Sequence, residues 1–317
     1  MALIAPFLGR LTVPAIAAPM FLVSGPGLVI AACRSGIAGT FPALNQRSTD
    51  GYVAWLEEIA QGLAAAEAET GRKPAPYGVN LIVHKSNTRL MADLTATVKA
   101  RVPLVITSLG AVRDVVDAVH SYGGIVLHDV TNRRHAEKAI LAGADGVIAV
   151  SAGAGGHAGT ISPFALIDEL RPVVGDRLLV LAGAISNGAA IAAAIAAGAD
   201  LAYLGTRFIA TKESLAPEDY KSMLVSSSSG DIVYTPKVSG IPANFLAPSL
   251  AKAGVDLTAL HGDAKLDLGN EAKAWSSVWS AGHGVSGIDE IVPIADLAIQ
   301  LKADFHNAYK RLAKYIN

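Results

Sequence analysis

The sequence is poor in cysteine, which limits the compartments and folds that suit it. Cys33 is the single cysteine in 317 residues, so no disulfide can form within the chain. Proteins of oxidising compartments commonly rely on disulfides, whereas a lone thiol is typical of a reducing cytoplasm. Cys33 lies in an apolar helical pattern, which predicts a buried and unreactive side chain.

Charge is also scarce, and its two signs are balanced. Charged residues make up 17% of the chain, with 26 basic and 27 acidic side chains and a formal net charge of -1. No run of Lys or Arg supplies the electrostatic attraction that nucleic acids and anionic membranes require. We therefore expect a small-molecule partner, and neither nucleic acid nor a membrane.

Long uninterrupted apolar runs are missing, although 51% of the residues are hydrophobic. The apolar region 1–32 contains Arg10 and four prolines, and Gly188–Ala199 is too short for a bilayer, which takes about 20 residues. No basic segment precedes a continuous apolar core, as it does in a signal peptide. The sequence predicts a soluble, cytoplasmic protein.

The chain does contain a regular alternation of apolar runs with amphipathic segments. Eight runs are predicted strands, most of them wholly apolar, as in a parallel sheet buried on both faces. They are Ala15–Pro19, Gly39–Pro42, Tyr77–Val83, Leu104–Ser108, Ile125–Asp129, Gly146–Val150, Leu178–Ala182 and Leu201–Leu204. Helical patterns follow at Gly27–Arg34, Tyr52–Thr70, Leu90–Ala100, Ala111–Ser121, Arg133–Leu141, Pro163–Val174 and Gly188–Ala197. The predicted fold is α/β, a (β/α)8 TIM barrel.

A short sequence repeat within the chain supports the barrel. Ala142-Gly143-Ala144-Asp145 and Ala197-Gly198-Ala199-Asp200 each end an Ala-rich helix before an apolar strand, with glycine at the helix C-terminus. A doubly wound open sheet is the rival fold, but it usually carries a glycine fingerprint after its first strand. Here the first strand ends in Pro19-Met20, which favours the barrel.

The alternation lapses after the eighth strand. From Ala216 to about Gly287 the chain is richer in Ser, Pro and Gly, and a helical pattern returns at Pro293–Tyr315. We expect a barrel at 1–215, completed by a C-terminal helix within 288–317. The insertion 216–287 would then fold over the C-terminal mouth of the barrel as a cap, although a loosely packed segment without a role is the alternative.

The most informative stretch runs from Val147 to Gly159. An apolar strand there opens into a loop with four glycines and His157. Glycine lets main-chain N–H groups approach a ligand, and histidine can take up or release a proton near neutral pH. The pattern suits a ligand site, while a tight turn with a solvated histidine remains the simpler alternative.

Two further loops suit a phosphate group. Phosphate sites in (β/α)8 barrels often form from the loops after strands seven and eight. The first of these loops holds Gly183 and Ala184, and the second holds Gly205 and Thr206 at the start of a helix. Their glycine N–H groups, the hydroxyl and the helix N-terminus together favour a phosphate.

Several motifs resemble those of nitronate monooxygenases, formerly called 2-nitropropane dioxygenases. They occur in order between about Ala15 and Ala210, with a weaker echo at Trp279-Ser280-Ala281-Gly282-His283-Gly284. The motifs are Ala18-Pro19-Met20, Tyr77-Gly78-Val79-Asn80, Ala154-Gly155-Gly156-His157-Ala158-Gly159, Leu181-Ala182-Gly183-Ala184-Ile185 and Leu204-Gly205-Thr206-Arg207-Phe208. They are more specific for the superfamily than for its substrate.

The resemblance implies an FMN-dependent oxidoreductase with a flavin across the barrel mouth. His157 would handle the proton beside the flavin, as base where a neutral nitroalkane is the substrate. The implied cofactor-binding residues are Pro19, Met20, Asn80, Asp129, Ala152, Gly155, Gly156, Gly183, Ala184, Gly205 and Thr206. The implied reaction oxidises alkyl nitronates with O2 to carbonyl compounds and nitrite, because the cofactor supplies the redox chemistry.

Two alternatives stay open. The same barrel serves FMN-dependent NAD(P)H reductases that act on quinones or enoyl thioesters. A barrel that binds a phosphorylated ligand without turnover is a third reading.

The chain departs from the family pattern at two positions. Asp129 stands where better-known members carry a basic residue near the flavin pyrimidine, and His283 stands where glutamine is expected. A carboxylate would not stabilise an anionic reduced flavin as a cation does. Either Asp129 faces elsewhere, a cation bridges it, or the flavin is tuned differently here; His283 could alter the substrate wall.

The remaining polar and aromatic residues carry weaker expectations. Trp275 and Trp279 would share one helix face, and Lys85 and Arg89 would lie solvated at the rim. No metal site is expected, because the remaining histidines lack ligand spacing; they are His84, His120, His135, His261 and His306. The Ala-rich, lightly charged helices would suit a homodimer face.

Overall fold

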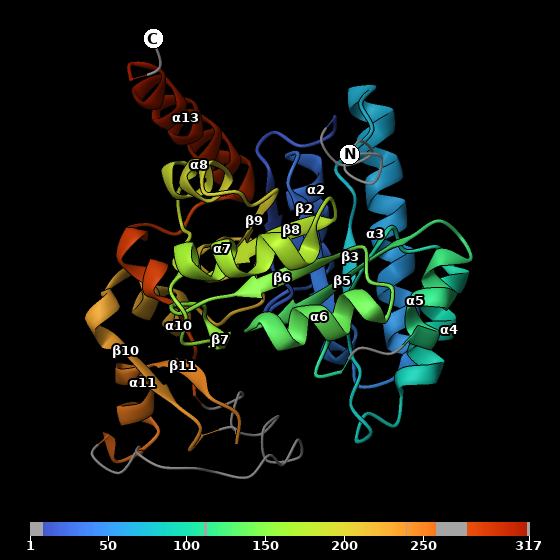
Figure 1. Cartoon of the computed structure of the whole chain (residues 1–317), viewed down its shortest axis with the longest axis horizontal. Coiled ribbons are helices and arrows are strands. Elements are labelled where there is room, and N and C mark those ends of the chain that lie inside the picture. The colour runs from blue at the N-terminus through green and yellow to red at the C-terminus, as the bar shows by residue number, and fades with distance from the viewer. Residues whose placement is uncertain (1–8, 111–112, 239, 258–277, 316–317) are drawn as a thin grey trace.

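The structure is a computed structural model that describes residues 9–110, 113–238, 240–257 and 278–315. Eight parallel strands close into a barrel in the order β1-β2-β3-β4-β5-β6-β8-β9 (Figure 1). Their bounds are β1 Ala15–Ala17, β2 Ala38–Pro42, β3 Gly78–Ile82, β4 Leu104–Ser108, β5 Ile125–Val130, β6 Gly146–Val150, β8 Leu178–Ala182 and β9 Leu201–Leu204. The register of β1 on β9, with Ile16 opposite Tyr203, closes the sheet. The predicted (β/α)8 barrel is confirmed.

Helices surround the barrel between successive strands. They are α2 Pro26–Arg34, α3 Thr49–Thr70, α4 Leu90–Lys99, α5 Arg113–His120, α6 Arg133–Leu141, α7 Pro163–Val174 and α8 Gly188–Ala196. The observed bounds differ by a few residues from the expected ones, for identifiable reasons. Ser48 caps α3 by accepting a hydrogen bond from Gly51 N–H, so α3 begins three residues earlier than the apolar pattern indicated. Ala111, the expected start of α5, lies outside the described residues.

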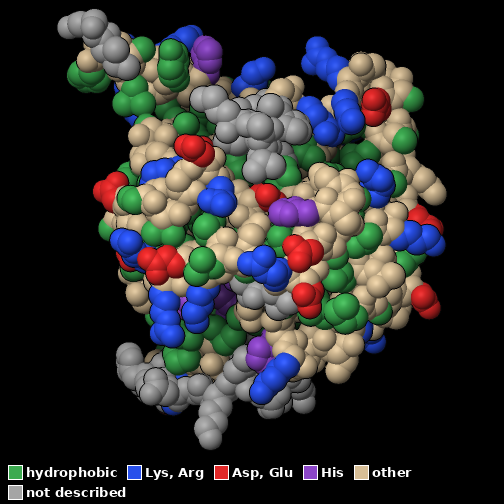
Figure 2. All heavy atoms as spheres, turned by 45° about the vertical axis from the view of Figure 1, so that its right-hand side comes forward, with side chains coloured by type: hydrophobic (Ala, Val, Ile, Leu, Met, Phe, Trp, Pro, Cys, Tyr) green, Lys and Arg blue, Asp and Glu red, His purple; other side chains and the backbone are tan. Residues whose placement is uncertain are grey.

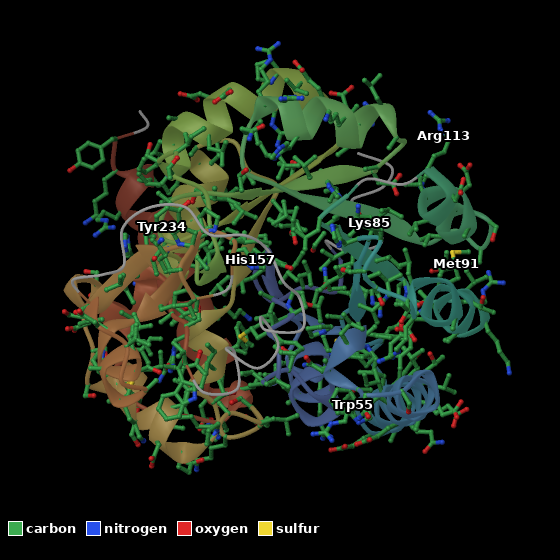
Figure 3. The ribbon with its side chains drawn as sticks, turned by 90° about the horizontal axis from the view of Figure 1, so that it is seen from below. Trp55, Lys85, Met91, Arg113, His157 and Tyr234 are labelled. Atoms are coloured by element: carbon green, nitrogen blue, oxygen red, sulfur yellow. The ribbon has the colours of Figure 1, made fainter. Side chains whose placement is uncertain are left out.

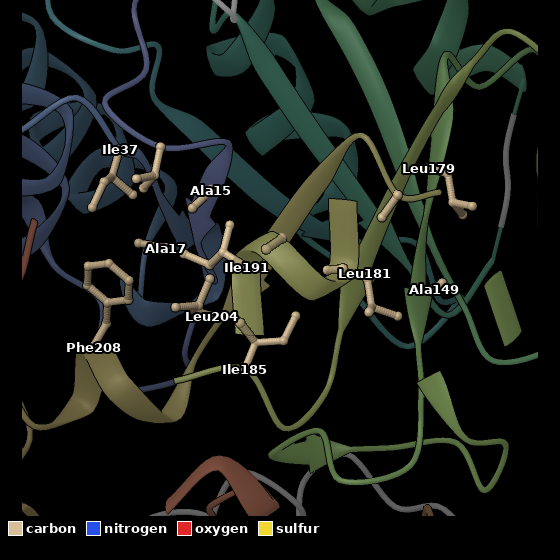
Figure 4. Packing of buried hydrophobic residues seen from close by; sticks show 14 of the residues in the cluster. Ala15, Ala17, Ile37, Ala149, Leu179, Leu181, Ile185, Ile191, Leu204 and Phe208 are labelled. Carbon is tan, nitrogen blue, oxygen red and sulfur yellow. The ribbon is translucent and has the colours of Figure 1, made fainter. Parts of the chain in front are cut away.

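Two hydrophobic layers hold the barrel together. Inside it, Ile16, Ile106, Leu127, Ile148 and Val180 belong to one buried cluster. A second layer lies between strands and helices, where side chains such as Ala149, Leu181, Ile191 and Phe208 pack together (Figure 4). Because both faces of each strand are buried, the strands are almost continuously apolar.

The repeated Ala-Gly-Ala-Asp sequence makes the same turn twice. Gly143 and Gly198 have φ values of +98° and +113°, a conformation that favours glycine at the end of a helix. The aspartates that follow accept hydrogen bonds from the neighbouring strands: Val126 N–H donates to Asp145 Oδ2 at 2.8 Å, and Leu179 N–H donates to Asp200 Oδ2 at 2.7 Å. Each motif therefore ends a helix and bonds the start of the next strand to the strand that precedes the helix.

The last helix, α13 Ile294–Ala313, packs against α8 and α2 (Figure 1). Its approach to α8 is close at Gly188, where an added Cβ would lie 2.0 Å from the Leu301 carbonyl oxygen. Helix α13 therefore lies between the helices that follow β8 and β1.

Between β9 and α13 the chain forms a separate layer, and we call residues 216–287 the cap. It contains α10 Glu218–Val225, β10 Ile232–Thr235, β11 Ala243–Leu246 and α11 Ala247–Lys252, with short 3-10 turns at Ser229–Asp231 and His283–Gly287. Strands β10 and β11 continue into β7, Gly156–His157, which comes from the loop after β6. The cap is thus hydrogen-bonded to a barrel loop.

On the face shown in Figure 2, basic and acidic side chains are interspersed. Among the described residues, no helix combines the length and the apolar character that crossing a membrane requires.

Candidate functional site

A cavity of about 360 Å³ opens at the C-terminal ends of the barrel strands. All eight strands, or the loops that directly follow them, contribute lining residues, and the cap covers part of the wall through Tyr220, Val278, Trp279 and Ser280. Ligand sites of (β/α)8 barrels lie at this end, because the loops there can vary without disturbing the core. The cavity is therefore the candidate site.

Most of the site residues predicted from the sequence meet in this cavity. Those that line it are Pro19, Met20, Asn80, Asp129, Gly155, Gly156, His157, Gly183, Ala184, Gly205 and Thr206. Ala152 is not among the lining residues; its N–H donates to the Ile161 carbonyl at 2.7 Å within the loop after β6.

Glycine brings three loops into close main-chain contact on one side of the cavity. A Cβ on Gly282 would lie 2.3 Å from the Gly153 carbonyl oxygen, and one on Gly183 would lie 2.2 Å from Ser151 Oγ. Ala184 has a positive φ of +56°, which is costly for a residue with a side chain. Three loop segments therefore fit together only with small residues where they touch. They are 153–155, 183–184 and 282–284.

Gly205 has a different role from these glycines. It lines the cavity, and a Cβ there would meet only Ala18 and Met20 side-chain atoms, at 3.8–3.9 Å. The surrounding protein therefore leaves room for a side chain that the sequence does not use. Beside it, Thr206 Oγ1 accepts a hydrogen bond from Gly282 N–H at 2.9 Å, which leaves the hydroxyl proton able to donate.

His157 lies on strand β7, between the barrel and the cap (Figure 3). In the sheet, His157 is paired with Ala243 of β11. The N–H of the neighbouring Gly156 donates to Ser280 Oγ at 2.6 Å. Asn244 Nδ2 also donates to the Ala154 carbonyl at 2.7 Å. Part of the expected glycine-rich loop is therefore a short strand, whose backbone is bonded to the cap.

A chain of hydrogen bonds crosses the floor of the cavity. Asn80 Nδ2 donates to Ser108 Oγ at 2.7 Å, and Ser108 Oγ donates to Asp129 Oδ2 at 2.6 Å. Asp129 lines the cavity, so the alternative in which it faces elsewhere is wrong. Burial raises the pKa of the Asp129 carboxyl from 3.8 to about 6, although the bond from Ser108 and the positive charge of His157 in its protonated form oppose the rise.

Tyr203 is a lining residue that the sequence analysis missed. It comes from β9, two residues before Gly205, and its hydroxyl is buried. Burial, and secondly the negative charge of Asp129, raise the pKa of this hydroxyl well above its usual value. The signal in the sequence was a tyrosine at the last inward position of an otherwise apolar strand.

The cap supplies an aromatic wall. Tyr220 and Trp279 stack with ring centroids 5.0 Å apart and planes 8° apart, and Lys252 Nζ lies 5.1 Å from the Trp279 ring centre. Trp279 lies outside the described helices, so the expected helix face shared with Trp275 is wrong. Trp275 lies outside the described residues.

The expectations for three further residues, His283, Lys85 and Arg89, had different outcomes. His283 is exposed and does not line the cavity, so the suggested role in the substrate wall is wrong; its N–H donates to the Gly153 carbonyl. Lys85 is exposed as expected (Figure 3), whereas Arg89 is half-buried and pairs with Asp93 at 3.0 Å. The described residues contain no cluster of His, Cys, Asp and Glu that could hold a metal, and His261 lies outside them.

The chain is similar in sequence to a known protein family and in fold to solved structures. The model of the nitronate monooxygenase family matches residues 7–304. A nitronate monooxygenase of Paraburkholderia phytofirmans is 28% identical over 96% of this chain and 95% of its own. Nitroalkane oxidase from Streptomyces ansochromogenes is 27% identical, with a TM-score of 0.81 over 98% of this chain and 100% of its own. FabK from Thermotoga maritima, 24% identical with a TM-score of 0.83 over 99% and 98%, shares the fold.

Replacing Asp129 with Asn should stabilise the protein more at neutral than at acid pH. The raised pKa of Asp129 means that the folded chain binds this proton more tightly than the unfolded chain does. The resulting stability is fully present below about pH 4 and is lost as the pH rises through about 6, a change of about 3 kcal/mol for a shift of this size.

Urea unfolding of the wild type and D129N at several pH values measures this effect. The variant's free energy of unfolding, relative to the wild type, should rise by up to that amount between pH 4 and 7. A difference that stays constant with pH would contradict a proton held by Asp129 in this range.

Proposed function

The chain belongs to the nitronate monooxygenase family and is an oxidoreductase, and from this premise we propose that it is an FMN-dependent enzyme that oxidises alkyl nitronates or nitroalkanes with O2. The products would be a carbonyl compound and nitrite. The observation that carries the proposal is the convergence of His157 with the glycine-lined loops after β6, β8 and β9 on one cavity.

The residues of the cavity fit a flavin mononucleotide. Gly205 leaves space that a Cβ would fill, and with Gly183, Ala184 and Thr206 it would hold the phosphate. Pro19 and Met20 would follow the ring edge, and Asn80 would hydrogen-bond the ring. When bound, FMN supplies the electron transfer from substrate to O2, while the protein provides placement and proton handling.

His157 is suited to act as the base for a neutral nitroalkane. Its backbone is fixed by β11, and the side chain lines the cavity. No lysine or arginine is among the described residues that line this cavity. Of those residues, His157 is therefore the one that can carry positive charge, which it would gain by taking the proton from the carbon next to the nitro group.

Reduction of the purified protein under argon tests the reaction class. We expect bound FMN to lose its visible absorption on addition of propionate 3-nitronate and to keep it with NADH or NADPH. Bleaching by a nicotinamide and not by the nitronate would instead assign the chain to the FMN-dependent reductases. A colourless protein that takes up no FMN would overturn the cofactor proposal.

Replacing Gly205 with Ala should weaken FMN binding and spare riboflavin binding. The added Cβ makes only ordinary protein contacts, so the free energy of unfolding should change by less than about 1 kcal/mol. It would occupy space at the phosphate, and losing one charge-assisted hydrogen bond costs about tenfold in affinity. Fluorescence titrations with both flavins measure this, and equal weakening of the two would place the phosphate elsewhere.

Replacing His157 with Asn should separate the two substrate forms. Loss of a general base costs about 10²- to 10⁴-fold in rate, so turnover of a neutral nitroalkane should fall by this amount. A pre-formed nitronate has already lost its proton and should be oxidised at nearly the wild-type rate. Oxygen consumption with each substrate gives the comparison, with FMN affinity as the control; unchanged nitroalkane turnover would exclude His157 as the base.

A further inference from the structure

Two buried oxygen atoms at the cavity floor have no hydrogen-bond partner among the described residues. They are Asp129 Oδ1 and the Tyr203 hydroxyl, and both residues line the cavity. They come from β5 and β9, and the pKa of the Tyr203 hydroxyl is raised by burial and secondly by the charge of Asp129, so the two groups interact. Buried polar atoms are normally paired, so two such oxygen atoms facing one cavity suit a polar ligand atom bound between them.

The donors and acceptors of the hydrogen bonds at the cavity floor show which oxygen of the Asp129 carboxyl group can carry a proton. The Asn80 amide nitrogen can only donate, so Ser108 Oγ accepts from it and donates its own proton to Asp129 Oδ2. Oδ2 is thereby an acceptor. A proton on this carboxyl group consequently sits on Oδ1, the oxygen without a described partner.

The charges around Asp129 are few. The strands on either side, β4 with Leu104–Ser108 and β6 with Gly146–Val150, contain no titratable side chain. The titratable groups that interact with Asp129 are His157 and Tyr203. Burial acts against the carboxylate form, so at moderately acid pH the floor presents two neutral O–H groups.

We propose that Asp129 Oδ1–H and the Tyr203 hydroxyl form a pair of neutral hydrogen-bond donors that binds a negatively charged ligand atom at the cavity floor. A tyrosine and a protonated carboxylic acid make such an oxyanion site in ketosteroid isomerase. Below about pH 6, where Asp129 is protonated, the pair would stabilise negative charge as the basic residue expected at position 129 would, because a donor can do so without being a cation.

The proposal rests on the proposed function for the identity of the ligand. Two sources supply a suitable acceptor: the flavin ring once it is reduced, and the nitro-group oxygens of a nitronate. Both present an anionic atom that gains from two donors, so two kinds of measurement are needed to separate them.

The first measurement is the midpoint potential of bound FMN without substrate, in the wild type, Tyr203→Phe and Asp129→Asn. Loss of one donor to an anion should weaken binding of the reduced flavin, relative to the oxidised flavin, about tenfold. For this two-electron couple that is about 30 mV lower in Tyr203→Phe. Tyr122→Phe is the matched control, because it removes a hydroxyl bonded to the Val102 carbonyl from a half-buried tyrosine that does not line the cavity.

Asp129→Asn tests the protonation state. Its amide keeps a donor, so at pH 5.5, below the Asp129 pKa of about 6, its potential should equal that of the wild type. A potential raised by the same amount at pH 5.5 and 8.5 would mean that Asp129 is a carboxylate throughout, and would overturn the proposal.

The second measurement is nitrate binding to the oxidised holoenzyme, followed by the flavin spectrum. Nitrate is a planar anion with N–O oxygens that cannot reduce a flavin. About tenfold weaker nitrate binding in Tyr203→Phe, with an unchanged potential, would assign the donors to the substrate, and the reverse pattern to the flavin. If Tyr203→Phe matches Tyr122→Phe in both measurements, the proposal is wrong.

A flavin-independent measurement separates this proposal from the proposed function. The ¹³C resonance of the Asp129 carboxyl, assigned with Asp129→Asn, can be titrated in the flavin-free chain. A midpoint near 6 supports a proton held at the floor even if the protein takes up no FMN. A midpoint near 4 overturns the proposal whatever the cofactor is.

Discussion

The position of His157 depends on a main-chain ladder between a barrel loop and the cap. Strand β7 is two residues long and gains its hydrogen bonds from β11, about ninety residues further along the chain. This pairing is reinforced by the bond from Asn244 Nδ2 to the Ala154 carbonyl. Because one ladder holds both parts, anything that loosens the cap also releases the histidine from its place in the cavity.

Glycine makes this arrangement possible in two distinct ways. At Gly282 and Gly183 the neighbouring loops leave no room for a Cβ, so glycine is required by the protein itself. At Gly205 the protein leaves room, and the absence of a side chain opens space to the cavity. A glycine whose Cβ would clash with backbone fixes the shape of the site, whereas one beside open space indicates where a ligand comes close.

The barrel and most of the cavity lining could be predicted from the sequence because they depend on local patterns. Each strand and its helix carry their own periodicity, and strand ends in a barrel meet at one mouth. The loops with Gly183 and Gly205 could thus be assigned to one site before any contact was known. Strand β7 could not be predicted, because its short glycine-rich segment has no strand pattern and pairs only with distant residues.

Asp129 shows why orientation had to come from the structure. The sequence identified it as an acid where a base was expected, but the pattern allowed it to face elsewhere, to be bridged by a cation or to tune the flavin differently. The inward orientation follows from the bond to Ser108, itself fixed by Asn80. A carboxylate buried there without a cation would be costly, whereas a neutral acid needs none and still donates a hydrogen bond. Because no lysine or arginine is among the described lining residues, the floor leaves positive charge in the cavity to His157, and a neutral pair of donors there does not compete with His157 for that role.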